Sequence, residues 1–79
     1  MKLTYDPKYD IAYICFREKP EQVETIQVSE ELNVDLAPDG TVYGIELLNA
    51  REQLTADRLG SLVVVNQESG ESETIKLAV

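Results

Sequence analysis

The sequence has 79 residues and a mass of 8.9 kDa, which leaves room for one small domain with a modest core. Seven basic residues against fifteen acidic ones give a formal charge of -8. A negatively charged protein repels a phosphate backbone, so direct nucleic-acid binding is not expected. The chain has no His and a single Cys, which excludes His-dependent catalysis, His-ligated zinc and an internal disulfide.

Apolar residues recur mostly at period two over the first 48 residues, which predicts β-strands. The strands are expected at residues 2–5, 11–17, 23–28, 32–36 and 41–48, with breaks that include Lys19-Pro20-Glu21 and Pro38-Asp39-Gly40. The strand at 11–17 is apolar on both faces, so a central position in the sheet is expected for it. Gly44 marks a bulge or a close approach. Together these segments predict an antiparallel β-meander of about five strands.

The rest of the chain is expected to form one short helix and a hairpin. Asn49 is a candidate N-cap with Glu52 three residues on, and the helix is expected over residues 50–59, before Gly60. Residues 61–79 read as a C-terminal β-hairpin. The predicted fold class is therefore α+β, mainly β, in a single small domain over residues 1–79, with the meander and helix start in 1–54 and the hairpin in 61–79.

A second layer is needed because the strand at 11–17 has no polar face. The helix and the hairpin supply that layer within one chain, or a second copy supplies it through a symmetric contact. The sequence favours a homodimer, which also answers the problem of the small core. The alternative is that Tyr13 and Cys15 simply pack under the helix with no partner.

Four tyrosines are candidates for an interface, because tyrosine combines apolar area with a hydrogen-bonding tip. They are Tyr5, Tyr9, Tyr13 and Tyr43. Ordinary half-buried positions in a sheet explain these residues equally well.

Four carboxylates are candidates for a divalent-cation site or for acid-base chemistry. They are Asp6 and Asp10, which flank the first turn, and Asp35 and Glu46, which are expected on neighbouring strands. The alternative is that Asp6 caps the turn and Asp10 caps the strand entry. A calcium loop, a Gly-rich phosphate loop, a nucleophile elbow and a Cys-x-x-Cys pair are all missing from the sequence. No cofactor, metal ligand or catalytic residue is therefore assigned, and a non-enzymatic protein is favoured.

Four segments at characteristic spacing resemble a known family. They are Tyr5-Asp6-Pro7, Asp10-Ile11-Ala12-Tyr13-Ile14, Asp39-Gly40 and Gly44-Ile45-Glu46-Leu47-Leu48-Asn49-Ala50. They are similar to the small bacterial and archaeal proteins catalogued as domain of unknown function 2283, over residues 1 to about 54. The resemblance implies a compact antiparallel sheet with a short helix, and it implies no activity. Tyr9, where a small residue often stands, and the hairpin at 61–79 depart from the common pattern.

These features together predict a small acidic interaction module that acts as a homodimer. Some members of the similar family lie beside small toxin-like genes, and the charge of -8 would suit a small basic protein, so an antitoxin-like role is one version of this hypothesis. The alternative is a small-ligand or divalent-cation-binding protein, a hydrolase for example, that uses the four carboxylates. The first ten residues lack the pattern of a signal peptide or a membrane span, so the cytoplasm is the expected compartment and no membrane partner is expected.

Overall fold

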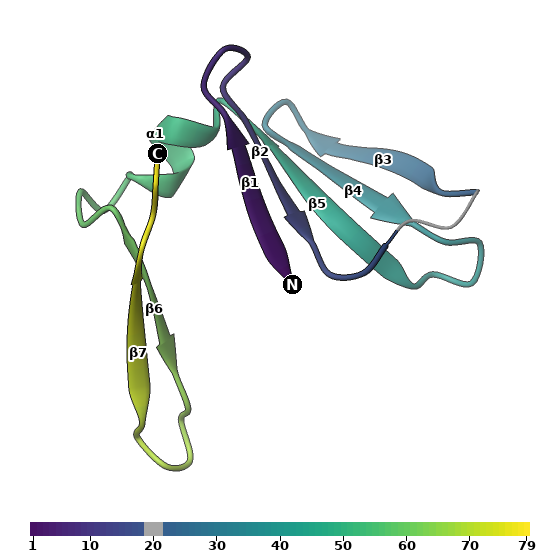
Figure 1. Cartoon of the computed structure of the whole chain (residues 1–79). Helices are drawn as coiled ribbons and strands as arrows, with labels where there is room; N and C mark the ends of the chain where they lie inside the picture. Colours follow the sequence, from purple (N-terminus) through teal and green to yellow (C-terminus); the bar gives the residue numbers. More distant parts are fainter. Residues whose placement is uncertain (19–21) are drawn as a thin grey trace.

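Five antiparallel strands form the main sheet in the computed structural model, which describes residues 1–18 and 22–79. They are β1 (Lys2–Asp6), β2 (Ile11–Cys15), β3 (Glu24–Ser29), β4 (Leu32–Leu36) and β5 (Val42–Leu48), in the spatial order β1-β2-β5-β4-β3 (Figure 1). The β1–β2 hairpin and the β3–β4–β5 meander are therefore joined by pairing of β2 with β5. The predicted fold class is confirmed, while the predicted break at Lys19-Pro20-Glu21 lies outside the described residues.

A short helix and a separate two-stranded hairpin follow the sheet: α1 (Ala50–Leu54), β6 (Ser61–Val65) and β7 (Ser72–Lys76). The helix ends five residues before the predicted end at residue 59. It ends because Thr55 has a φ of -115° and its hydroxyl donates to the Arg51 carbonyl oxygen at 2.6 Å. Arg58 and Gly60 then take left-handed φ values of 64° and 65°, which a right-handed helix cannot contain.

The start of α1 is capped by Asp10 and not by the predicted Asn49. The Ala50 N–H donates to the Asp10 carbonyl oxygen at 3.0 Å, and the Arg51 N–H donates to Asp10 Oδ1 at 2.9 Å. Asn49 is itself left-handed, with a φ of 52°, and its side-chain amide donates to the Glu52 carboxylate instead. The turn between β1 and β2 therefore fixes the position of the helix.

The turn predicted at Pro38-Asp39-Gly40 is confirmed. Gly40 has a left-handed φ of 90°, and its N–H donates to the Ala37 carbonyl oxygen at 2.9 Å. The Thr41 N–H donates to Asp39 Oδ1 at 2.9 Å. Hydrogen bonds from the Thr41 side chain and backbone hold the pKa of the exposed Asp39 carboxyl below its usual value.

The register gives the sheet two faces of different character. One face, called the apolar face below, carries Leu3, Tyr5, Ala12, Ile14, Ile26, Leu32, Val34, Ile45 and Leu47. The other, called the polar face, carries Lys2, Thr4, Asp6, Tyr13, Thr25, Gln27, Asn33, Asp35 and Glu46, with Ile11, Cys15, Gly44 and Leu48 among them. The strand β2, predicted to be central, is hydrogen-bonded on both edges and contributes to both faces.

The chain has very little buried core. Among the described residues, Ala12 and Ala50 are the buried apolar ones, and no large side chain is fully buried. On the apolar face, Leu3 and Ile26 are 36% and 40% exposed. Figure 1 shows why: the hairpin of β6 and β7 extends away from the sheet and does not form a layer over it. The second layer expected from the sequence is thus mostly missing in the single chain.

Candidate functional site

A hydrogen-bonded network on the polar face centres on the buried carboxyl group of Asp35 in β4. The Tyr13 hydroxyl of β2 donates to Asp35 Oδ2 at 2.7 Å, and the Thr25 hydroxyl of β3 donates to Asp35 Oδ1 at 2.6 Å. Asp35 is 6% exposed, so its carboxyl group loses contact with water. The two hydrogen bonds offset the cost of this desolvation. The network links three strands and crosses the fourth, β5, which lies between β2 and β4.

Gly44 of β5 is what allows Tyr13 to reach Asp35. A Cβ atom built at Gly44 would collide with the hydroxyl and the ring carbons of Tyr13. The tyrosine ring therefore lies across the glycine backbone, directly over the strand that separates it from Asp35. The close approach predicted at this glycine is confirmed.

The four predicted carboxylates are engaged in two separate regions. Asp6 accepts a bond from the Lys8 N–H at 2.9 Å, as expected for a residue that caps the first turn, and Asp10 accepts from Arg51 at the helix start. Asp35 lies in the network just described, and Glu46 on the same face accepts from the Asn33 side-chain amide at 2.9 Å.

A metal-binding arrangement is not found within residues 1–18 and 22–79. In those residues, no group of three or more His, Cys, Asp or Glu side chains is placed to hold a metal ion. Each of the four predicted carboxylates accepts a hydrogen bond from a protein donor. These contacts suit turn capping and cross-strand pairing.

The structure distributes the four predicted tyrosines over different surfaces. Tyr5 lies on the apolar face and Tyr13 on the polar face. Tyr9 lies in the first turn, is 65% exposed and has the Lys8 amine 5.3 Å from its ring centroid. Tyr43 lies at the opposite end of the sheet from Tyr5, with the Arg17 guanidinium 5.7 Å from its ring centroid. The tyrosines therefore do not gather into one patch.

Tyr5 connects the apolar face to the cap of the helix, because its hydroxyl donates to Asp10 Oδ1 at 3.1 Å. Desolvation, together with the hydrogen bond to the Asp10 carboxylate and its negative charge, raises the pKa of the Tyr5 phenol above its ordinary value of 10.0. The neutral phenol therefore stabilises the fold fully below pH 10.0, and this contribution is lost as the pH rises through the raised pKa.

A change of Tyr5→Phe is expected to remove this alkaline loss of stability. The melting temperature of the wild type should fall more steeply than that of the variant above a pH of about 10. Circular dichroism melts at a series of pH values measure the difference. Tyr9→Phe serves as the control, because Tyr9 is an exposed tyrosine of the first turn. Its melting temperature should follow that of the wild type at each pH. Parallel curves for the wild type and Tyr5→Phe would contradict the expectation.

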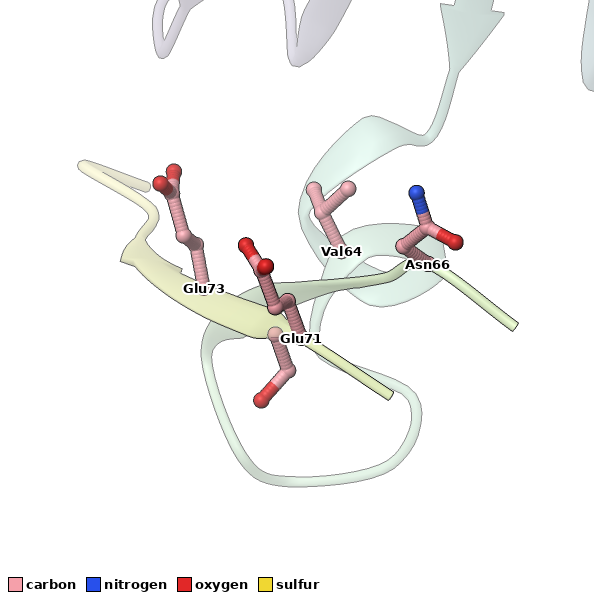
Figure 2. Close-up of a pocket in the computed structure, with 5 residues that line it drawn as sticks. Val64, Asn66, Glu71 and Glu73 are labelled. Carbon is pink, nitrogen blue, oxygen red and sulfur yellow. The ribbon is translucent and has the colours of Figure 1, made fainter. Parts of the chain in front are cut away.

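A hollow of about 600 Å³ lies near the tip of the C-terminal hairpin. Val64 and Asn66 line it from one arm of the hairpin, and Glu71, Ser72 and Glu73 line it from the other. Figure 2 shows the labelled side chains projecting from the two arms of the hairpin. Asn66 already accepts bonds from the Glu68 and Ser69 N–H groups in the turn, so this hollow is a feature of the turn.

A more apolar groove lies between the hairpin and the main sheet, with a volume of about 550 Å³. The sheet side contributes Leu3, Ile14 and Phe16, and the hairpin side contributes Leu62, Ile75 and Leu77. Lys76 also lines the groove. Since the other lining side chains are apolar, water in this groove has few polar partners there. The groove is the concave part of the uncovered apolar surface.

These features define a small, mainly β protein with a polar network on one sheet face and an uncovered apolar surface on the other. The chain matches the model of the family described as "Protein of unknown function (DUF2283)" over residues 2–51, more than half its length, and it belongs to that family. The resemblance seen in the sequence is confirmed. The match ends inside α1, so the C-terminal hairpin lies beyond it.

No curated protein and no solved structure matches the chain. Among residues 1–18 and 22–79, no helix has the length and apolar character that crossing a bilayer requires.

Proposed function

We propose that this protein is a non-enzymatic interaction module that acts as a homodimer through the apolar face of its sheet. The observation that supports this is its exposed area. One chain exposes 6223 Å², whereas a folded monomer of this mass exposes about 4,800 Å². The excess, about 1,400 Å² per chain or twice that per pair, is the amount that obligate homodimers bury.

The shape and the position of the excess surface agree with this proposal. The radius of gyration is 14.1 Å, against about 11.6 Å for a compact domain of this length. The uncovered residues include Leu3 and Ile26 on the sheet and a run of valines on the hairpin. Exposed apolar surface of this extent is typical of protein–protein contacts.

Charge defines the type of further partner that such a module would accept. A dimer carries twice the single-chain charge of -8, which favours a basic protein and disfavours nucleic acid. An antitoxin-like role toward a small basic protein is one form of this module. The module acts in the cytoplasm.

The mass of the protein in solution tests the proposal. Native mass spectrometry or light scattering should find twice the chain mass of 8.9 kDa. Leu3→Asp, on the apolar face, should weaken the dimer about 10- to 100-fold because a buried leucine contributes about 1.5 to 3 kcal/mol.

Thr4→Asp is the matched control, since Thr4 adjoins Leu3 on the same edge strand but lies on the polar face. It should leave the dimer intact. A wild type that is monomeric at micromolar concentration, or equal weakening by both variants, would refute the proposed contact.

A further inference from the structure

The C-terminal hairpin has two apolar faces that need cover. Leu62 of β6 and Ile75 of β7 pair on its inner face, which is turned toward the groove. Val63 and Val65 lie on the outer face, where Thr74 and Ser72 are their uncharged partners. The two valines are 48% and 54% exposed. Because an isolated two-stranded hairpin is at best marginally stable in water, both faces call for contacts.

The chain's own sheet can cover one of these faces only. If the hairpin closed over its own groove, Leu62 and Ile75 would meet Leu3 and Ile14. The outer valines would then remain in water. A layer on the other side of the hairpin must therefore come from another molecule.

We propose that two copies exchange hairpins, each hairpin entering the groove of the other copy. This inference rests on the proposed homodimer and adds the element that makes the contact. A two-fold axis then gives four layers: the sheet of one copy, the hairpin of its partner, its own hairpin, and the sheet of the partner. Each outer hairpin face packs on the partner's apolar sheet face, and the two inner faces pack on each other. One symmetric contact then covers both hairpin faces and the apolar face of each sheet.

The local geometry suits an arm that moves as a unit. The Leu77 N–H donates to the Gly60 carbonyl oxygen at 2.9 Å, which closes the base of the hairpin. Arg58 and Gly60, with their left-handed φ values, turn the chain away from its own sheet just before this base. The hairpin is thereby held apart from the sheet that precedes it in the chain (Figure 1).

The charge distribution permits two acidic copies to associate in this way. The outer hairpin face presents Val63, Val65, Ser72 and Thr74, and it carries the positive charge of Lys76 at the base, opposite Ser61, without a carboxylate from β6 or β7. Glu71 and Glu73 lie near the tip, on the inner face. If the two hairpins cross near their bases, at Leu62 and Ile75, these carboxylates project past the crossing into solvent. Like charges are then kept apart.

Contacts between copies test the exchange directly in the full-length protein. Isotope-labelled and unlabelled chains are unfolded together and refolded, and filtered nuclear Overhauser effects are recorded between them. We expect contacts from the Val63 and Val65 methyl groups of one copy to the Leu3 and Ile14 methyl groups of the other. A dimer whose intermolecular contacts exclude the hairpin would overturn the exchange and leave the proposed homodimer standing. A monomer would overturn both.

A pair of variants gives a second readout. Val63→Asp, on the outer face, should weaken the dimer about 10- to 100-fold. Gln67→Asp introduces the same carboxylate in the turn at the tip and should change the dissociation constant less than about twofold. Equal effects of the two variants would overturn the exchange. The contacts measured in the wild type decide the matter if Val63→Asp fails to fold.

Discussion

Replacement of Gly44 by Ala is expected to lower the free energy of unfolding by about 2 to 3 kcal/mol. The added Cβ would occupy the space of the Tyr13 hydroxyl and ring, so the ring must leave its place over β5. Moving it breaks the 2.7 Å hydrogen bond to Asp35 and leaves a buried carboxyl group with one donor fewer. Urea unfolding at one fixed protein concentration measures the loss, since a dimer's stability depends on concentration.

A double-mutant cycle with Tyr13→Ala shows whether the ring is the cause. Without the ring, the three atoms nearest to the added Cβ are gone, so Gly44→Ala should be neutral or should stabilise the strand by about 0.5 to 1 kcal/mol. The coupling between the two changes should therefore be at least about 2 kcal/mol. Additive effects would mean that the close approach at Gly44 has another role.

Local sequence patterns predicted the strands well because period-two alternation and turn residues act over short distances. The bounds of β4 agree with the prediction at both ends, and β1 and β5 differ by one residue at one end. The strand β3 is shifted by one residue at both ends, and β2 ends two residues before its predicted end. The turn at Gly40 was predictable for the same reason, since a left-handed glycine after Pro-Asp is a local preference. These elements depend on few residues outside themselves.

The start and end of the helix depended on residues that the local pattern did not include. Asn49 fits the rule for an N-cap, yet the Arg51 N–H bonds to Asp10, 41 residues earlier in the chain. No local signal reports that partner, because pairing of β2 with β5 is what brings the turn to the helix. At the other end, Thr55 and Arg58 terminate a segment whose composition alone favours a longer helix.

The candidate site shows the same limit. Asp35 was expected on a strand next to that of Glu46, as the structure has it, but its burial under Tyr13 requires the strand order and the absence of a side chain at Gly44. Thr25 was missed because a threonine in an exposed strand gives no sign of its partner. The strand order also decides which tyrosines are neighbours, so a count of tyrosines could not locate an interface.

The single change Asp35→Leu is expected to cost about 2 to 4 kcal/mol of unfolding free energy. It removes the acceptor for the Tyr13 and Thr25 hydroxyls, and each part-buried donor left without this partner adds a desolvation penalty. The leucine itself is compatible with a sheet, so its own propensity contributes little to the loss. Urea unfolding at fixed concentration again provides the measurement.

The triple change Tyr13→Phe, Thr25→Val and Asp35→Leu is expected to recover most of that stability, to within about 1 kcal/mol of the wild type. The three polar groups that these two hydrogen bonds join are then removed together. The role left to the network is specificity. A one-residue slip of β4 would place Asp35 on the apolar face, and the carboxyl group disfavours that register. The triple variant should therefore keep its stability while its amide spectrum shows more than one register, and a triple variant as unstable as the single one would contradict this.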